Sequence, residues 1–581
     1  MRLINLYFRS IVVLSLMFTA LMLIFTTLII VAGFDSSFWI LGALIALLFI
    51  FVQFLISPWL MDFFLPWIYA MQWYQIEDTP PHISNFIKAL QEDHKFNFKQ
   101  IGIIEDDNPN AFTYGHFRKN ARLVISRGIF TYLTNEEQQA VIAHEIGHVV
   151  HRDFIWMTVA SAIPVLAYTV YAGLSYSARD LSRSRSGNKN SGSAAAGMYA
   201  IAIGAWLVYF ISGYLVLLLS RIREYYADRF SGEVTGKPED LSSALVKIAY
   251  GMIVADAKMS SDMSEGRASS KAKWQSSFNK GVRAMGIFDV KSAKAMSMTI
   301  QGRGQKVNAK AVATAASWDL SHPWAKFLEL QSTHPLPAKR LKALDKQTVF
   351  MGREPQYPDL GKIKPPESLW DEFLIEVFLE YMLPILIIVF PIITGFLTWY
   401  YADGTINPLI GAGIGMLVIA LLWYYRKTVK YPKLDTQQEL VEVTFPLVDM
   451  TKNSYYEASP VRGKAVAVEG IVIGRGTPGY FLSEDLVVQD NTGIVRLDYS
   501  PILFFMSWFF ALFRVPQLMG EKIRVYGWYH RTPSPSIQVY RIFAPERTFK
   551  NHWAGLNNFI ALFLLFIAIV LIALSLSMGP L

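Results

Sequence analysis

The chain has 581 residues, of which 52% are apolar, and its formal net charge is +8. This length exceeds one ordinary domain, and the apolar fraction is typical of a membrane protein. The sequence contains no cysteine, which excludes disulfides, cysteine-ligated zinc and thiol catalysis. Cytoplasmic flanks of membrane spans explain the positive charge better than binding to nucleic acid does.

Two long apolar runs occupy residues 11–34 and 38–60. A signal peptide is the competing interpretation of the first run, which follows Arg2 and Arg9. However, the run is longer than a usual signal-peptide core and lacks a convincing small-residue cleavage site. Two runs joined so tightly predict a transmembrane hairpin over residues 1–60 that starts and ends in the cytoplasm.

Residues 97–105 and 121–126 are strand-like, and residues 108–115 between them predict a turn. An edge strand beside a catalytic helix could pair with an extended peptide through main-chain hydrogen bonds. A purely structural hairpin is the equally supported alternative.

Residues 144–148 read His-Glu-Ile-Gly-His, an instance of the H-E-x-x-H pattern. Residues at i and i+4 share one face of a helix, so His144 and His148 can bind one ion. Glu145 can then act on the metal-bound water as general base. A capping box at residues 134–137 supports the helix that this pattern needs.

Two further apolar runs, at residues 154–174 and 194–220, predict two more transmembrane helices. The polar stretch between them, residues 175–190, carries three arginines and a lysine. Its charge favours the cytoplasm, whereas two full spans place it on the opposite side. The sequence leaves this conflict open.

Glu224 follows directly after the second of these runs and is the candidate third zinc ligand. Two spans of about 20 residues each and a loop fill the gap from His148 and return the chain to the side that it left. Asp228, one helical turn further on, is placed to orient a ligand histidine as a hydrogen-bond acceptor. Alone, Glu224 would be an ordinary juxtamembrane charge, but an intact H-E-x-x-H favours the ligand interpretation.

Several of these segments together resemble the HtpX-type membrane metalloproteases, which are relatives of the CAAX prenyl proteases. The matching segments are residues 108–112 (NPNAF), 133–137 (LTNEE), 144–148 (HEIGH), 224–228 (EYYAD), 241–248 (LSSALVKI) and 333–335 (THP). The resemblance covers about residues 1–345. It implies a gluzincin-type zinc endopeptidase domain, mainly α-helical with a small β-sheet. One Zn²⁺ per chain would lie at the cytoplasmic face of a membrane, expected to be a bacterial inner membrane.

The resemblance also implies roles for single residues. The implied zinc ligands are His144, His148 and Glu224. Glu145 would activate the water, His334 would help to stabilise the oxyanion, and Asn110 would lie on the segment that contacts the substrate backbone. A structural turn is an equally supported role for His334. Three other histidines are expected to be structural, namely His116, His151 and His322.

Within the protease region of residues 61–345, residues 256–319 depart from the family pattern and predict a mobile, partly helical insertion. Beyond residue 345 the resemblance ends. Residues 346–433 predict a linker and a second transmembrane hairpin, with runs at 381–400 and 409–425. Basic residues follow the second run, which indicates a return to the cytoplasm.

Residues 434–550 alternate as strands do and predict a small OB-like β-barrel domain on the cytoplasmic side. This domain lacks an obvious basic-aromatic strand face, so nucleic acid is not expected as a partner. The apolar segment 501–513 is too short to span and is predicted to dip into the bilayer. Residues 551–581 contain a final span at 559–576.

The sequence therefore predicts a polytopic α-helical membrane protein with about seven spans, a zinc protease domain and a C-terminal β-barrel. Its expected partners are the lipid bilayer and protein substrates, above all membrane proteins, in a quality-control role. A processing protease with a dedicated client is one alternative. A non-catalytic scaffold that binds partners through the β domain is the other. The oligomeric state is not predicted.

Overall fold

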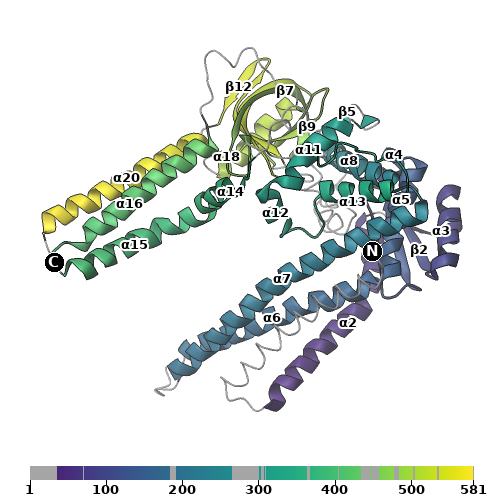
Figure 1. Ribbon diagram of the computed structural model, residues 1–581, viewed down its shortest axis with the longest axis horizontal. Coiled ribbons are helices and arrows are strands. Elements are labelled where there is room, and N and C mark those ends of the chain that lie inside the picture. Colours follow the sequence, from purple (N-terminus) through teal and green to yellow (C-terminus); the bar gives the residue numbers. More distant parts are fainter. Residues whose placement is uncertain are drawn as a thin grey trace. The chain divides into compact units, whose positions relative to one another are not determined.

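Figure 1 shows the computed structural model of the chain. It describes residues 36–69, 71–183, 191–264, 300–301, 306–307, 309–362, 367–403, 405–432, 447, 457–476, 483–501, 504–532, 535–551 and 553–579. The chain forms two compact units. The first comprises Met1–Ile248, Gly281–Asp289 and Leu328–Gln356, and the second comprises Ala249–Lys280, Val290–Phe327 and Tyr357–Leu581.

The first unit contains a four-stranded sheet. Its strands are β1 (Gln72–Tyr74), β2 (Phe98–Ile104), β3 (Ala111–Gly115) and β4 (Ala121–Ser126), in the order β1-β2-β4-β3. The neighbours β2 and β4 are parallel, whereas the other two pairs are antiparallel. Central strand β4 is buried along its whole length, and β3 is an edge strand. The predicted turn at residues 108–115 is therefore wrong in part, because its second half is strand β3.

The rest of the described secondary structure of this unit is helical. The helices are α2 (Ser36–Tyr69), η1 (Ile76–Asp78), α3 (Pro81–His94), α4 (Arg127–Tyr132), α5 (Asn135–His151), α6 (Asp153–Arg183), α7 (Ser191–Thr235) and α13 (Pro337–Phe350). Helix α8 (Pro238–Ser264) begins in the first unit and continues into residues of the second. Helices α6 and α7 pack along a core that includes Ala160, Ala167 and Leu219. Small alanines allow the two helices to approach closely.

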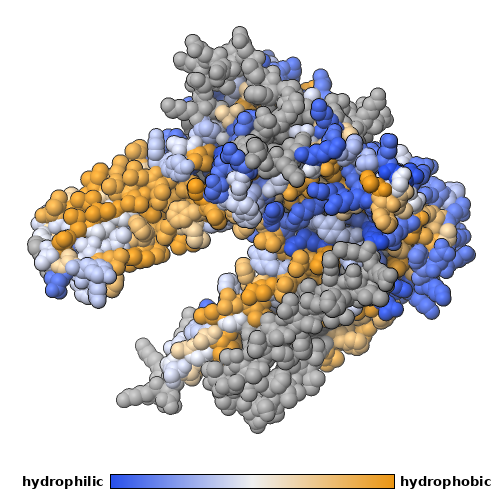
Figure 2. Space-filling view, in the orientation of Figure 1, coloured by the Kyte–Doolittle hydropathy of each residue, from blue (hydrophilic) through white to orange (hydrophobic). Residues whose placement is uncertain are grey.

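Five helices within the described residues are long and apolar enough to cross a membrane. They are Asp153–Ser182, Gly192–Thr235, Trp370–Ala402, Pro408–Lys430 and Gly555–Met578. Figure 2 shows apolar side chains along these long helices. The five coincide with five of the predicted apolar runs, and the chain is an integral membrane protein. The predicted run at 11–34 lies outside the described residues. The run at 38–60 lies in α2, in which the described residues contain one shorter apolar helix, Phe54–Tyr69.

Helix α7 has 45 residues. A bilayer needs only about 20 helical residues, so α7 is long enough to extend well beyond a membrane. Its C-terminal part packs against α5 and α13 in the first unit. The length of α7 thus carries Glu224 and Asp228 from a membrane span into the folded part of the protein.

The second unit contains a further set of helices and a short two-stranded sheet. The helices are α11 (Ala309–Ser321), α12 (Pro323–Glu329, which ends in the first unit), α14 (Trp370–Val377), the π-helical η2 (Phe378–Met382), α15 (Leu383–Ala402), α16 (Pro408–Lys430), α18 (Phe504–Phe509), the π-helical η4 (Phe510–Arg514), α19 (Val515–Leu518) and α20 (Trp553–Met578). The short sheet pairs β5 (Ile300–Gln301) with β6 (Lys306–Val307). Helix α16 packs against both α15 and α20. A Cβ atom at Gly411 of α16 would overlap Thr398 Oγ1 of α15, so the close approach of these two helices requires glycine.

A six-stranded sheet forms the C-terminal β domain. Its strands are β7 (Lys464–Arg475), β8 (Leu486–Gln489), β9 (Ile494–Asp498), β10 (Lys522–His530), β11 (Ser536–Ala544) and β12 (Arg547–Lys550). The order is β10-β7-β8-β9-β11-β12, and an additional β10–β11 pairing closes the sheet on itself. The inward residues of these strands, such as Val468, Val525 and Ile537, form its apolar core.

The predicted insertion at residues 256–319 ends earlier than expected. Residues 309–319 belong to α11, and eight of its residues are buried. Arg531 donates to the Ala315 carbonyl (2.9 Å) and to Asp319 Oδ1 (3.3 Å), and its guanidinium lies over the Trp318 ring. This alanine-rich helix is therefore part of the packed core of the second unit. Residues 265–299 lie outside the described residues.

Candidate active site

Helix α5 carries the H-E-x-x-H residues and begins where the sequence predicts. Thr134 Oγ1 accepts a hydrogen bond from Glu137 N (3.3 Å), and Thr134 N donates to Glu137 Oε2 (2.9 Å). This reciprocal capping box fixes the start of the helix. Arg152 adopts a left-handed conformation and ends it. The residues at positions 144–148 are thereby held in regular helix between two defined ends.

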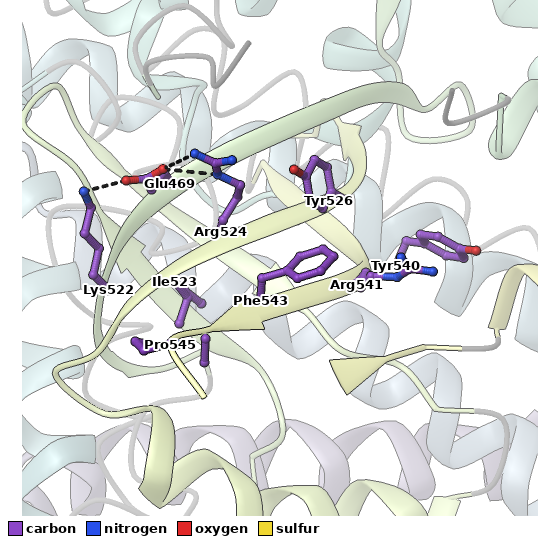
Figure 3. Close-up of a pocket in the computed structure, with 10 residues that line it drawn as sticks. Glu469, Lys522, Ile523, Arg524, Tyr526, Tyr540, Arg541, Phe543 and Pro545 are labelled. Atoms are coloured by element: carbon purple, nitrogen blue, oxygen red, sulfur yellow. Dashed lines mark hydrogen bonds and ion pairs between the residues drawn. The ribbon is translucent and has the colours of Figure 1, made fainter. Parts of the chain in front are cut away.

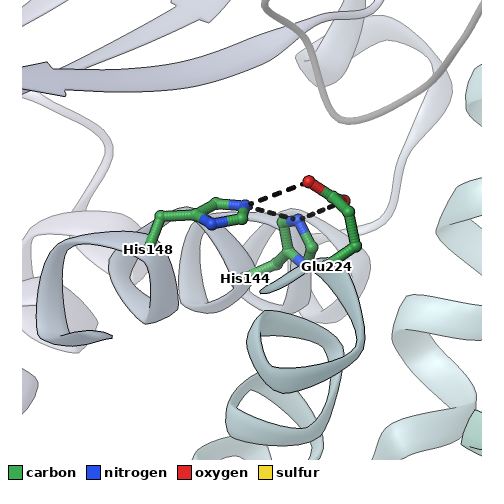
Figure 4. A group of neighbouring side chains, drawn as sticks. All are labelled: His144, His148 and Glu224. Carbon is green, nitrogen blue, oxygen red and sulfur yellow. Dashed lines mark hydrogen bonds and ion pairs between the residues drawn. The ribbon is translucent and has the colours of Figure 1, made fainter. Parts of the chain in front are cut away.

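Three candidate ligand atoms converge beside α5 (Figure 4). His144 Nε2 lies 3.2 Å from His148 Nε2 and 3.6 Å from Glu224 Oε2, while His148 Nε2 lies 3.7 Å from Glu224 Oε1. In a tetrahedral site with Zn–N bonds of about 2.0–2.1 Å, ligand atoms are separated by roughly 3.3 Å. The three side chains therefore have the spacing and the donor chemistry that one zinc ion requires.

A carboxylate holds each histidine ring in the orientation that a metal ligand needs. Asp228 Oδ1 lies 2.9 Å from His144 Nδ1, and Asp153 Oδ2 lies 2.7 Å from His148 Nδ1. The contact between His148 and Asp153 is a hydrogen bond, and Asp228 lies within ion-pair distance of His144 Nδ1. A carboxylate beside Nδ1 favours a proton on that nitrogen, which leaves the Nε2 lone pair for an ion. Asp228 was expected in this position. Asp153, five residues after His148, was not.

Two buried arginines balance part of the negative charge. Arg340 donates to both oxygens of Asp228 (2.9 and 2.6 Å) and lies 3.4 Å from Glu224 Oε2, and Arg223 lies 2.7 Å from Asp153 Oδ1. Burial alone would lower the pKa of Arg340, but Asp228 and Glu224 raise it above the ordinary value. The guanidinium therefore stays charged.

The charges of this cluster support a divalent ion. With the imidazoles neutral, as zinc ligands are, the charged groups give a formal net charge of −2 in a buried environment. They are the four carboxylates of Glu145, Asp153, Glu224 and Asp228 and the two guanidiniums of Arg223 and Arg340. Uncompensated buried charge is costly, and one Zn²⁺ would neutralise it. The residues present thus fit zinc in spacing, donor type and charge.

Glu145 lies next to the ligand atoms and is 97% buried, since only 3% of its surface is exposed. Burial raises the pKa of its carboxyl, although the neighbouring His148 and His144 oppose this shift. Thr113 on edge strand β3 donates from Oγ1 to Glu145 Oε2 (3.2 Å). A carboxylate with a raised pKa beside a metal site suits a general base.

His334 is brought to the same cluster. Its Nε2 lies 3.6 Å from Glu224 Oε1, and its Nδ1 is 2.9 Å from Thr333 Oγ1. The ring nitrogen therefore reaches the cluster from a segment more than a hundred residues after Glu224. Asn110 lies at the entry to strand β3, where its N–H donates to Ser126 Oγ (2.7 Å).

The three histidines expected to be structural lie in packed surroundings. His116 Nε2 is 2.8 Å from the Leu55 carbonyl, and burial lowers the pKa of His151 to about 4. His322 belongs to the second unit, where its ring stacks on Trp318.

Four residues of the site were missed from the sequence, namely Thr113, Asp153, Arg223 and Arg340. Asp153 carried a signal, because an acid directly after the end of a metal-binding helix can reach back to the last histidine. Arg223 stands next to Glu224 and resembled one of several juxtamembrane cations. Thr113 and Arg340 come from distant segments, and no local pattern marks them.

Comparisons with known proteins agree with this geometry. The model of the family described as "Peptidase family M48" matches residues 79–348. A "Protease HtpX homolog" of Methanothermobacter thermautotrophicus is 34% identical over 199 residues, which cover 34% of this chain and 69% of that protein. A homologue from Burkholderia ambifaria is 30% identical over 236 residues, which cover 38% of this chain and 77% of that protein. Another homologue, from Pyrobaculum calidifontis, is 32% identical over 249 residues, which cover 43% of this chain and 62% of that protein.

A solved structure, the crystal structure of S. mikatae Ste24p, aligns with a TM-score of 0.31 at 16% identity. The alignment covers 59% of this chain and 67% of that one. The sequence matches, the membrane helices and the His-His-Glu cluster lead to one conclusion. The chain belongs to the HtpX proteases of peptidase family M48 and is a membrane-embedded metalloprotease.

Proposed function

We propose that the protein is a gluzincin-type zinc endopeptidase that cleaves membrane or membrane-associated proteins in membrane-protein quality control. The observation that carries this proposal is the convergence of His144, His148 and Glu224 beside the buried carboxylate of Glu145. Bound zinc would acidify a water molecule and polarise the substrate carbonyl.

The side chains of the site divide the remaining work. Glu145 accepts a proton from the attacking water and returns it to the leaving amine. Asp228 and Asp153 fix the two imidazole rings. His334 would donate a hydrogen bond from Nε2 to the developing oxyanion, which is worth about 3 kcal/mol when the donor is preorganised.

The edge strand β3 supports an extended peptide as the substrate. One edge of β3 pairs with β4, and Thr113 on β3 contacts the general base. A peptide that adds to the outer edge of β3 would run past Glu145 and form main-chain hydrogen bonds with the strand. Asn110, at the entry to β3, would contact the substrate backbone.

The C-terminal β domain supports an OB-like assignment. Five strands form a ring in the order β7-β8-β9-β11-β10, the β9–β11 pair is parallel, and helices α18, η4 and α19 lie between β9 and β10. A closed five-stranded sheet of this kind is typical of OB folds. We assign the protease domain to residues 61–345, the second hairpin to 346–433 and this domain to 434–550.

The cytoplasmic placement of the active site rests on charge. Lys427 and Lys430 lie in the last turn of α16, which favours the cytoplasm for the β domain. The basic stretch 175–190 begins in the C-terminal part of α6, and its residues 184–190 lie outside the described residues. Its charge favours the opposite orientation for the hairpin of α6 and α7. Cysteine labelling of this stretch in sealed vesicles would determine its side, because the chain has no native cysteine.

Two experiments test the proposed function. Purified protein should contain zinc and cleave casein, chelation should abolish cleavage and added zinc should restore it. Absence of both zinc and cleavage, with partners still bound through residues 434–550, would favour the scaffold alternative. Trapping of clients on the Glu145→Gln protein in membranes tests the substrate class. Many unrelated membrane proteins are expected, whereas a single client would indicate a processing protease.

A further inference from the structure

The outward face of strands β10, β11 and β12 carries a cluster of cations and aromatic rings. In the strand register Tyr526 lies opposite Arg541, and Arg541 lies opposite Lys550. The Arg541 guanidinium lies 5.6 Å from the Tyr540 ring, and Lys550 Nζ lies 5.7 Å from the same ring. A hollow of about 490 Å³ extends along this face between Tyr540 and Glu469 (Figure 3). No such basic-aromatic face was expected from the sequence.

A β-bulge explains why the sequence did not reveal this face. The β10–β11 register passes from Tyr526↔Arg541 to Gly527↔Val539 and skips Tyr540. Strict alternation would place Tyr540 and Arg541 on opposite faces of β11. The bulge breaks this alternation and turns both side chains toward the same face, which is the re-aiming that bulges produce.

The cations on this face differ in how their charge is compensated. Lys522 and Arg524 both form ion pairs with Glu469. Arg541 and Lys550, by contrast, lie directly opposite each other and form no ion pair with a carboxylate among the described residues. Like charges directly opposite on neighbouring strands are destabilising. This pair is therefore suited to an anion.

The other side of β12 contacts an exposed apolar segment, α18–η4. Phe510 of this segment is buried, stacks on Tyr499 and makes an edge contact with Phe549 of β12. Six large apolar side chains of α18–η4 remain exposed to solvent, namely Phe505, Met506, Trp508, Phe509, Leu512 and Phe513. The segment is too short to span a bilayer, but an exposed Trp/Phe/Leu face beside basic residues is typical of interfacial membrane segments.

The cationic face and the apolar segment α18–η4 both contact β12, which lies just before the transmembrane helix α20. Strand β12 ends at Lys550, and α20 begins at Trp553. Tyr540 also contacts Trp528, whose Nε1 donates to the carbonyl of Pro432, just past the end of α16 (2.9 Å). The cationic face is thus continuous with the end of α16 and the start of α20, two helices that are long and apolar enough to span a membrane.

We propose that this face and α18–η4 together bind the β domain to the surface of an anionic bilayer. The apolar side chains of α18–η4 enter the headgroup region, and Arg541 and Lys550 bind phosphate groups of anionic phospholipids. Membrane lipid is the favoured source of the phosphate because only a bilayer would also cover the six exposed apolar side chains. Each cation near such a surface is expected to contribute about fivefold to binding.

The proposal can be tested with the full-length protein in nanodiscs. Because the chain has no cysteine, Phe509→Cys gives a single attachment site for an environment-sensitive dye. In nanodiscs of phosphatidylglycerol and phosphatidylcholine, lipid-borne quenchers should reduce the dye emission more than in phosphatidylcholine alone. The double variant Arg541→Gln/Lys550→Gln should reduce quenching to the phosphatidylcholine level. Lys522→Gln is the matched control, because that cation is already paired with Glu469, and it should change nothing.

Several results would overturn the proposal. Equal quenching in both lipids would do so, as would a double variant that behaves like its parent while unfolding at the same temperature. Inorganic phosphate that removes the phosphatidylglycerol effect without changing ionic strength would identify a site for the free anion. A labelled oligothymidylate that binds the protein in phosphatidylcholine nanodiscs through Arg541 and Lys550 would identify a nucleic-acid surface instead.

Discussion

Replacement of Arg340 by methionine tests how the metal site is held together. Arg340 and Asp228 expose only 1% and 2% of their surfaces, and the guanidinium makes two hydrogen bonds to Asp228 in addition to its contact with Glu224. Arg340→Met would leave two carboxylates buried without this cation. Removal of one partner of a buried ion pair typically costs about 3–5 kcal/mol. The carboxylate of Asp228 would also lose the contact that positions it against His144.

The assay is thermal unfolding of detergent-purified protein, together with its zinc content. A loss of about 3–5 kcal/mol in the free energy of unfolding should lower the unfolding midpoint by about 10 °C. The variant should also retain less zinc. Arg353→Met is the matched control. Arg353 donates to Glu239 (2.7 Å) at the protein surface, with 45% of its side chain exposed. Surface pairs contribute only about 0–1 kcal/mol. Equal midpoints and equal zinc contents for Arg340→Met and the parent would refute the reasoning.

Three further predictions concern other residues. Asp153→Asn weakens the orientation of His148 and should lower zinc affinity about 10–100-fold in a chelator competition; unchanged affinity would show that this contact is not used. In a plot of kcat/KM against pH, the midpoint of the acidic limb, where activity falls as the general base is protonated, should lie above the ordinary glutamate pKa of 4.5. Burial raises the pKa of Glu145 and is the reason for this expectation. Thr113→Val removes a hydrogen bond that stabilises the carboxylate, so it should move this limb to higher pH, and a shift to lower pH would contradict the assignment. Burial lowers the pKa of His530 to about 4 from 6.5. The unfolded chain therefore takes up a proton first as pH falls, and the free energy of unfolding should drop by about 3 kcal/mol between pH 6.5 and 4. His530→Gln should flatten this part of the pH-stability curve, and an unchanged slope would exclude His530 as its cause.

The metal-binding helix could be predicted because its signals are local. The capping box and the spacing of His144 and His148 all lie within one helix, and a helix repeats its geometry regardless of what packs around it. Glu224 was also predictable, since its place after two membrane spans follows from chain length alone. Arg340 was not, because it follows Asp228 by 112 residues and only the packing of α13 against α7 brings them together.

The β regions show where alternation patterns mislead. The NPN segment before Ala111 predicts a turn, and the structure continues directly from it into edge strand β3. In the C-terminal domain the bulge at Tyr526/Gly527 places Tyr540 and Arg541 on one face. A period of two residues cannot reveal a bulge, since the extra residue is recognised only against its partner strand.

In the proposed mechanism His144, His148 and Glu224 hold the metal while Glu145 moves the proton. Zinc content and casein turnover measured on the same preparation of Glu145→Gln test it most directly, with Glu136→Gln, exposed in the first turn of the same helix, as the control. We expect one zinc per chain in both variants, with full turnover for Glu136→Gln and a loss of turnover of at least about 100-fold for Glu145→Gln. Full proteolysis by the Glu145→Gln protein would contradict the account.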